Sequence, residues 1–447
     1  MISSPFAYFT DAVLRGPTIG CMLMCAAAAI VGVIVFLRKQ SLLGESLSHA
    51  AYPGVVLGVC FAGIFQIDEE NESLLALIIM VGASATAFAG LWTISFLEKH
   101  MKVKSDSALC FVLSVFFGVG LTLASRVQFT YTSLYRQIQV YLYGQAATMT
   151  DVHVLIYGIL TCVVVGVVIL FYKELYLLAF DRSYAKSLGV NSRAIDMLVF
   201  LLIVAAVVIS IRSVGVVLMS AMLIAPAAAA RQYSNKLYVV FILAAFFGLL
   251  SGFLGNYLSV EISKIYSTQE DFQRVTLATG PMIVVTASIL CLLSLLLAPE
   301  RGLLIRFTRI TLFRYRCACE NLLKAIWRVG QERTVSFDQI SKFQSASTLY
   351  LRFILWRLQL QGWIKKTSEG YKLSPIGHQW ATRIVRLHRL WEVYLVDYLG
   401  VGAERVHKSA EEMEHIISPE LEKELEFLLN NPKYDPHHQP IPDRTRL

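Results

Sequence analysis

The chain has few charged residues, no ATP-binding loop and no paired cysteine motif. Only 16% of its 447 residues are charged and 56% are hydrophobic, whereas about 25% of residues are charged in an ordinary soluble domain. This composition excludes a disordered chain and a wholly soluble enzyme. Neither GxxxxGK[ST] nor HExxH occurs in the sequence, which argues against an ATPase and a zinc metallopeptidase. The eight cysteines form no CxxC motif, so we expect neither a disulfide framework nor a zinc ribbon.

The charges that are present divide the chain into three parts. Residues 1–299 have a net charge of +2, residues 300–390 of +12 and residues 391–447 of −6. A hydrophobic body is therefore followed by a basic segment, which suits phosphate or anionic lipid. An acidic segment comes last, and it suits cations or simple solvation.

The hydrophobic body contains nine stretches near the length of about 20 apolar residues that crosses a bilayer. They are Pro17–Leu37, Leu47–Phe65, Leu74–Leu97, Ser107–Ser125, Val152–Tyr172, Ile195–Ile211, Val214–Ala230, Leu237–Leu258 and Pro281–Ala298. The sixth and seventh are short and could form a hairpin that does not fully cross. One set of loops holds eleven basic residues and the other holds six. The positive-inside rule then places the N-terminus outside and the basic segment in the cytoplasm.

Two ionisable residues occur together in the second stretch. Glu45 and His49 are four residues apart in GESLSHAAYPG, so they share one helical face. Placing such groups within a membrane is energetically unfavourable unless they pair with each other or face water. Together they could bind a divalent cation such as Mn²⁺, Fe²⁺ or Zn²⁺. A satisfied buried ion pair, or polar residues at the membrane edge, would explain them equally simply.

A second feature is the loop LLAFDRSYAKSLGVNS at residues 177–192. Tyr184, Ala185 and Leu188 could form a short amphipathic helix on the cytoplasmic side. The alternative is an ordinary loop between two spans.

These motifs, taken in order, resemble the ABC-3 family of bacterial metal-importer permeases. The resemblance rests on GESLSHAAYPG, YLYG at 141–144, FDRSYAKSLGV at 180–190, SVGVVLMSAMLIAPAAAAR at 213–231 and TGPMIVV at 279–285. It implies a permease homodimer with a cytoplasmic ATPase and an extracytoplasmic metal-binding lipoprotein. It further implies that Glu45 and His49 take part in metal translocation. The segment from Asp181 through Ala185 and Leu188 to Gly189 would be the helix that couples to the ATPase.

The segment after the last span contains five arginines among apolar residues. They are Arg301, Arg306, Arg309, Arg314 and Arg316. An interfacial helix on anionic lipid and a basic linker are both consistent with this pattern.

The periodicity beyond this segment is that of a soluble domain. It predicts helices at Asn321–Val329, Ser336–Phe343 and Thr348–Gln361, then a β-hairpin at Trp363–Ser374 that turns at Glu369-Gly370. This order is typical of a winged helix-turn-helix, whose third helix enters the major groove. Candidate DNA-binding residues are Thr348, Tyr350 and Arg352 on that helix and Lys365, Lys366 and Lys372 on the wing.

Histidine and glutamate then recur at helical spacing. A helix over Ile384–Gly400 carries His388 and Glu392, and the next one carries His407, Glu411, Glu414 and His415. Exposed helices can carry such residues for solubility alone. Two sets beside a helix-turn-helix favour a metal site.

Residues 374–401 and 406–429 resemble the DtxR/MntR family of metal-dependent repressors. The resemblance assigns His388, Glu392 and His407 to an ancillary metal site, and Glu411, Glu414 and His415 to a primary site. The primary-site ligand from the first helix falls on Asn321, and Cys317 and Cys319 are nearby alternatives.

We therefore expect an all-α polytopic membrane protein followed by a winged helix-turn-helix and an α-helical metal-binding and dimerisation domain. The expected bounds are 1–299, 300–319 for a juxtamembrane linker, 320–377 and 378–447. The whole resembles a chlamydial-type permease–repressor fusion in the bacterial inner membrane. Its metal would be Mn²⁺ or Fe²⁺, with Zn²⁺ as a further option, and its partners would include operator DNA and membrane lipid. A membrane-tethered sensor that does not transport is the alternative. Proteolysis within Glu300–Cys319 would release the repressor.

Overall fold

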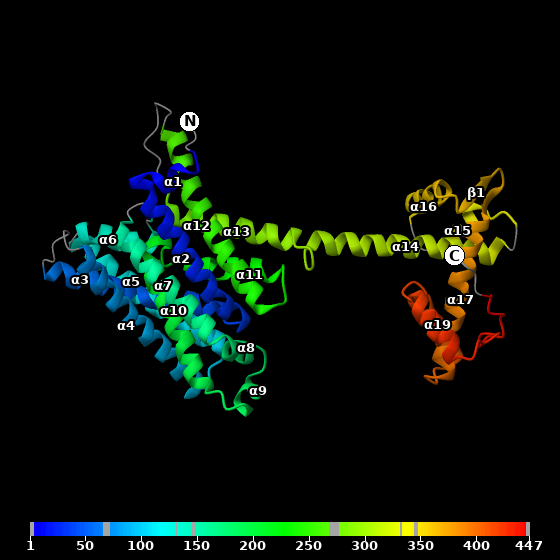
Figure 1. The fold of residues 1–447 in the computed structure, drawn as a ribbon, viewed down its shortest axis with the longest axis horizontal. Helices are drawn as coiled ribbons and strands as arrows, with labels where there is room; N and C mark the ends of the chain where they lie inside the picture. The colour runs from blue at the N-terminus through cyan, green and yellow to red at the C-terminus, as the bar shows by residue number, and fades with distance from the viewer. Residues whose placement is uncertain are drawn as a thin grey trace. The chain divides into compact units, whose positions relative to one another are not determined.

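The computed structural model describes residues 4–65, 72–130, 132–144, 146, 149–267, 277–330, 333–343 and 347–443. The chain forms two compact units, Met1–Ile305 and Arg306–Leu447. Each unit is described by itself below, and Figure 1 labels the elements of both.

The described part of unit 1 is helical. Its helices are α1 (Ala7–Thr10), α2 (Ala12–Leu37), α3 (Ser41–Ile64), α4 (Glu72–Lys99), α5 (Ser105–Thr130), α6 (Thr132–Tyr143), α7 (Asp151–Leu170), α8 (Tyr172–Phe180), α9 (Arg182–Ser187), α10 (Ser192–Val214), α11 (Met219–Arg231), α12 (Leu237–Ser267) and α13 (Thr279–Leu297). Eight helices in the described ranges are long and apolar enough to cross a membrane.

The seventh expected span, Val214–Ala230, contains only the 13-residue helix α11. Gly215 ends α10 with a φ of 92°, a conformation that suits glycine because it has no Cβ atom. The chain resumes a helix only at Met219. This turn is the reason why the seventh hydrophobic stretch is too short to span the bilayer as one helix.

Helix α2 lies at the centre of one group of helices in unit 1 (Figure 1). Helix α2 contacts α7, α10, α11 and α12, while α3 packs against α4 and α5. Most of α2 is buried, including the run from Cys25 to Val35. Because α2 is apolar on all sides, it occupies the interior of the unit.

Glycines allow several of these helices to touch backbone to backbone. A Cβ atom added at Gly54 of α3 would overlap the carbonyl oxygen of Gly82 in α4, and one at Gly32 of α2 would overlap that of Leu223 in α11. A Cβ atom at Gly252 of α12 would lie 2.7 Å from the carbonyl oxygen of Cys21 in α2. Small residues of this kind allow membrane helices to pack closely.

Replacing Gly54 with alanine should therefore separate α3 from α4. We expect G54A to lose about 1–3 kcal/mol of stability, the usual range for an overpacked core. The measurement is the thermal unfolding of the detergent-purified chain. Gly118 of α5 is the matched control, because an added Cβ there meets no atom within 4 Å. An unfolding temperature for G54A equal to that of G118A would show that this contact does not constrain the fold.

The first part of unit 2 contains three helices and a β-hairpin. The elements are α14 (Leu303–Gly330), which begins before the unit boundary, α15 (Phe337–Phe343), α16 (Thr348–Leu360), β1 (Ile364–Thr367) and β2 (Gly370–Leu373). The strands are antiparallel, and Ile364 pairs with Leu373. Leu323, Ile354 and Leu358 belong to the buried core between these elements. The expected winged helix-turn-helix is thus confirmed.

Two boundaries in this part differ from expectation. Helix α14 begins at Leu303 instead of Asn321, because residues 303–329 contain no proline or glycine that would end a helix. The hairpin strands end at Thr367 and resume at Gly370. The turn is therefore formed by Ser368 and Glu369, one residue before the predicted position.

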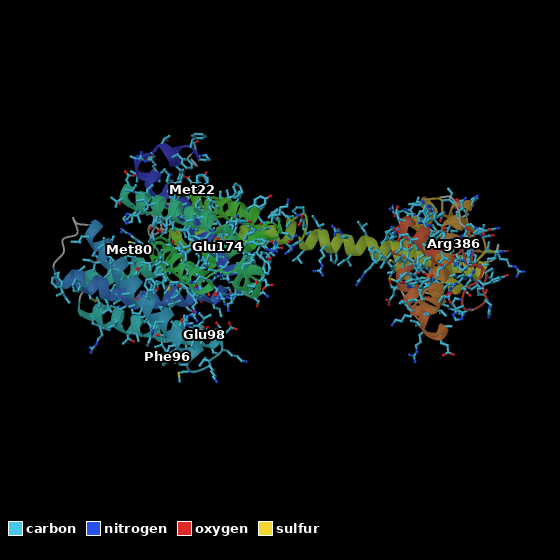
Figure 2. The ribbon with its side chains drawn as sticks, turned by 60° about the horizontal axis from the view of Figure 1, so that its bottom comes forward. Met22, Met80, Phe96, Glu98, Glu174 and Arg386 are labelled. Atoms are coloured by element: carbon cyan, nitrogen blue, oxygen red, sulfur yellow. The ribbon has the colours of Figure 1, made fainter. Side chains whose placement is uncertain are left out.

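The second part of unit 2 is formed by α17 (Pro375–Asp397), the short helix η2 (Ala403–Arg405), α18 (Val406–Met413) and α19 (Pro419–Leu428). Helix α17 begins nine residues before the expected Ile384. Its start is fixed by Ser374, whose side chain accepts a hydrogen bond from the Gly377 amide, and by Pro375 in the first turn. Arg386 of α17, labelled in Figure 2, donates to Glu426 of α19 across 2.8 Å. This bond joins the two helices.

Candidate metal sites, coupling helix and DNA-binding surface

The two polar residues of the second span lie on α3. His49 is buried and Glu45 is half-buried. The His49 ring makes an edge contact with Phe117 of α5, with 4.4 Å between ring centroids. Its Nδ1 atom is buried and has no hydrogen-bond partner among the described residues. Pro53 lies in the same helix, one turn further on. Because a buried nitrogen without a partner is unfavourable, this position suits a ligand that an imidazole can bind.

Three of the motifs found in the sequence meet at one place in unit 1. Gly144 of YLYG and Gly215 of SVGVV have φ angles of 79° and 92°. A Cβ atom at Gly215 would lie 2.6 Å from the Leu142 carbonyl oxygen, and one at Gly280 would lie 2.7 Å from that of Val214. The loops before α7, after α10 and before α13 therefore form one junction of closely packed backbone.

The loop expected to couple to an ATPase contains a short helix, α9. The Asp181 side chain caps it by accepting hydrogen bonds from the amides of Ser183 and Tyr184, both across 2.9 Å. Gly189 ends the loop with a φ of 79°, and Leu188 is 56% exposed. Ala185 is fully buried, so it supports the helix from inside instead of forming its exposed face.

The coupling loop is tied to two spans through one carboxylate. Arg38, at the end of α2, donates to Asp196 of α10 across 2.9 Å. Arg182 of α9 donates to the other oxygen of the same carboxylate. The position of α9 is therefore linked to those of α2 and α10.

In unit 2, the three residues assigned to the ancillary site come together. His388 and Glu392 lie on α17 and His407 lies on α18. The His388 Nε2 atom is 3.1 Å from the Glu392 Oε1 atom, and His407 Nδ1 is 3.0 Å from both. Within the described ranges, this trio is the group of ligand atoms that lie within 4.8 Å of one another. Two imidazoles and a carboxylate suit Mn²⁺, Fe²⁺ or Zn²⁺, so the residues fit a divalent metal.

The electrostatics of the trio keep its carboxylate charged. Burial raises the pKa of the Glu392 carboxyl, but hydrogen bonds with His388 and His407 outweigh this effect and lower that pKa to about 2. Burial lowers the pKa of His388, but its hydrogen bonds with Glu392 and Glu414 raise it above its usual value overall.

The residues assigned to the primary site are not gathered in the same way. Glu411 is exposed and reaches His407, with 3.5 Å between the His407 Nε2 and Glu411 Oε1 atoms. Glu414 is paired with Lys324 of α14, and the His415 Nδ1 atom is 2.6 Å from Glu320 of the same helix. Asn321 of α14 is half-buried.

Two residues of this region were missed by the sequence prediction. Glu320 and Lys324 are buried, at 4% exposure each, and both contact the candidate ligands. Both lie close to Asn321 in the sequence. The prediction had therefore chosen a neighbouring face of α14 as the one that meets the ligand-bearing helices. The suggested substitute Cys319 is buried in the winged-helix core. The signal that could have identified Glu320 and Lys324 is their i,i+4 spacing on the apolar side of an amphipathic helix.

The candidate DNA-binding residues lie on the surface. Thr348, Tyr350 and Arg352 are exposed on α16, and Lys365, Lys366 and Lys372 are exposed on the wing. Arg352 stacks over the Phe337 ring at 5.4 Å from its centroid. Lys365 pairs with Lys372 across the hairpin. Exposed cationic side chains on a wing are suited to phosphate contacts.

Comparison with known proteins identifies both units. The model of the ABC 3 transport family matches residues 10–298. The chain belongs to this family. A second model, the metal binding and dimerisation domain of iron dependent repressors, matches residues 374–443. Members of the first family are permease subunits and are not enzymes themselves. The protein is accordingly a multi-pass metal-transport permease of the inner membrane with a C-terminal domain of the metal-dependent repressor type.

Similarity to individual proteins extends over nearly the whole chain. A probable metal transport system membrane protein of Chlamydia pneumoniae is 38% identical over 98% of each chain. A manganese transport system membrane protein of Bacillus subtilis is 32% identical over 84% of this chain and 82% of its own. PsaBC from Streptococcus pneumoniae, solved with a Fab, has a TM-score of 0.57 at 25% identity and covers 70% of this chain and 100% of its own. Other relatives are named as zinc or iron transport proteins.

Proposed function

We propose that unit 1 imports Mn²⁺ or Fe²⁺ and that unit 2 is a repressor that binds operator DNA when the same metal is abundant. The observation that carries the proposal is the convergence of the buried His388 and Glu392 with the exposed His407, in a chain whose first unit is a metal permease. A metal-binding regulator attached to an importer would sense the ion that the importer delivers. Manganese is supported by the Bacillus subtilis relative, a manganese transport system membrane protein.

In the permease, Glu45 and His49 contact the transported ion. A carboxylate oxygen and an imidazole nitrogen on one helical face can replace part of the hydration shell of a divalent cation. The partially buried Glu45 and the unpartnered Nδ1 atom of His49 support this role. The permease works as a homodimer and receives its ion from an extracytoplasmic lipoprotein.

The energy comes from a separate ATPase subunit in the cytoplasm. The exposed part of α9, with Leu188 after it, docks on that subunit. Asp181 caps the helix, Ala185 packs beneath it and Gly189 allows the chain to turn after it. The Arg182–Asp196–Arg38 link carries movement of the docked helix to the spans α2 and α10.

In cells that also carry the ATPase and lipoprotein, Glu45→Gln and His49→Ala should each reduce uptake of radioactive Mn²⁺ at least tenfold, because each removes a ligand from the pathway. Glu98→Gln in the last turn of α4 and His100→Ala directly after that helix are matched controls and should transport normally. Leu188→Asp should also abolish uptake, and the ATPase should no longer copurify. Normal uptake in both Glu45→Gln and His49→Ala would exclude them from the pathway.

In the regulator, His388 and Glu392 of α17 and His407 of α18 would hold the metal ion and would thereby be joined through it. The acidic C-terminal segment also loses negative charge when a cation binds, which reduces repulsion of DNA phosphates. Helix α16 then lies in the major groove, and the wing lysines Lys365, Lys366 and Lys372 contact the backbone.

Mn²⁺ should therefore tighten binding of the full-length protein to the promoter DNA of its own operon by about tenfold or more. His407→Ala should remove this dependence, whereas His378→Ala, an exposed histidine at the start of α17, should retain it. Fluorescence anisotropy with labelled DNA, in Mn²⁺ and in chelator, makes the measurement. Equal affinities in the two conditions for the unmodified protein would contradict metal-dependent repression.

A repressor held in the membrane can search little DNA. We infer that a protease cuts between Glu300 and Cys319, in the cytoplasm, where Leu303, Phe307 and Leu312 of α14 are exposed. When uncut, this arginine-rich stretch rests on anionic lipid. Immunoblotting of membrane and soluble fractions with an antibody to the C-terminus should detect a soluble fragment. Finding only the full-length membrane form while repression continues would mean that the tethered form acts directly.

A further inference from the structure

Lys324 of α14 is buried within unit 2, where it contacts two of the residues assigned to metal binding. Its Nζ atom is 2.6 Å and 2.9 Å from the two oxygens of Glu414 and 3.2 Å from the Nδ1 atom of His388. The Lys324 side chain is 6% exposed and that of Glu414 is fully buried. An unpaired charge at this depth would be strongly unfavourable, so the ammonium and the carboxylate depend on each other.

The neighbouring groups have the arrangement of a metal site that is only partly built. The buried Nε2 atom of His415 has no hydrogen-bond partner among the described residues and lies 3.7 Å from the Glu414 Oε1 atom. The other ring nitrogen of His415 contacts Glu320, and a carboxylate in that position commonly orients a metal-ligating histidine. The Glu414 carboxylate and the His415 ring are therefore placed close together, as two ligands of one metal ion are. The ammonium group of Lys324, however, already occupies the position beside the carboxylate.

We propose that Lys324 is a built-in cation that takes the place of a second metal ion in the regulator. This inference rests on the proposed function, in which the trio of His388, Glu392 and His407 binds the regulatory metal. Lys324 neutralises the Glu414 carboxylate. It also keeps divalent ions away from that carboxylate, because a metal ion bound there would be repelled by the adjacent lysine ammonium. The regulator then has a single metal site, the trio.

The same contact gives Glu414 a positioning role. Its Oε2 atom is 2.6 Å from His388 Nδ1, while His388 Nε2 faces Glu392 and His407. A carboxylate on the far nitrogen fixes the tautomer and the ring orientation of a metal-ligating histidine. Lys324 also joins α14, the first helix of the winged helix-turn-helix, to α17 and α18 without any metal. The contact of α14 with α17 and α18 is thus formed before metal binds. Metal binding at the trio then changes only the neighbouring contact between α17 and α18.

The test counts the Mn²⁺ ions bound to the full-length protein. The purified chain is dialysed to equilibrium against Mn²⁺ alone, and bound metal is measured by mass spectrometry. The double variant Lys324→Met with Glu414→Gln removes both charges and keeps an amide to hold His388. Replacing a buried ion pair in this way is often neutral for folding. We expect this variant to bind as many ions per chain as the unmodified protein. One ion fewer would show that Glu414 is itself a metal ligand and would overturn the proposal.

A second variant tests for a gain of metal. Lys324→Glu places a second carboxylate beside Glu414 and His415, and it should bind one ion more per chain than the unmodified protein. Lys408→Gln, an exposed lysine of α18, is the control for loss of a positive charge and should leave the count unchanged. A folded Lys324→Glu variant with an unchanged count would overturn the proposal.

His407→Ala separates the failure of this inference from that of the proposed function. It should bind one ion fewer than the unmodified protein because it breaks the trio. An unchanged count in His407→Ala would remove the trio as the regulatory site. The comparison of the Lys324 variants with the unmodified protein would still decide whether the ammonium excludes metal from Glu414.

Discussion

Membrane helices gain little by burying apolar side chains against one another, because lipid is as apolar as the side chains are. Unit 1 therefore depends on close contact between helix backbones, and its glycines provide that contact. Gly54 and Gly82 bring α3 against α4, while Gly248 and Gly252 bring α12 against α2. The fixed approach of α3 sets where Glu45 and His49 lie. The same principle shapes the junction at Gly144, Gly215 and Gly280, where a side chain on any of the three would displace a neighbouring loop.

Unit 2 is held together differently, through charged groups removed from water. Lys324, Glu414 and His388 form one chain of contacts, and Glu320 with His415 forms another. Each buried charge is stable only because its partner is present. The helix-turn-helix and the ligand-bearing helices consequently share their most buried polar groups. These contacts connect the ligand region directly to α14, the first helix of the winged helix-turn-helix.

Much of this architecture could be predicted from the sequence because it follows from hydrophobic length and helical period. Eight of the nine expected spans and the winged helix-turn-helix came from hydrophobic length and residue spacing, whereas the trio of His388, Glu392 and His407, which joins two helices, came from the family resemblance. The short α11 was harder, because its start depends on the φ angle of Gly215, which is set by packing against another loop. The roles of Glu320 and Lys324 could not be read from spacing within one helix. They depend on how α14 is rotated about its axis against α17 and α18, and the family pattern placed that face one residue away, on Asn321.

Pro53 interrupts the hydrogen-bond pattern of α3. Proline has no amide hydrogen, so the carbonyl oxygen of His49, four residues earlier, has no donor within the helix. In a bilayer, a backbone oxygen of this kind is tolerated only where a neighbour or an aqueous cavity satisfies it. The residue that offers an unpartnered imidazole nitrogen thus also has a main-chain oxygen without its usual helical donor. His49 consequently carries two electron-pair donors, a softer imidazole nitrogen and a harder carbonyl oxygen. A substitution of the His49 side chain removes the nitrogen and leaves the oxygen in place.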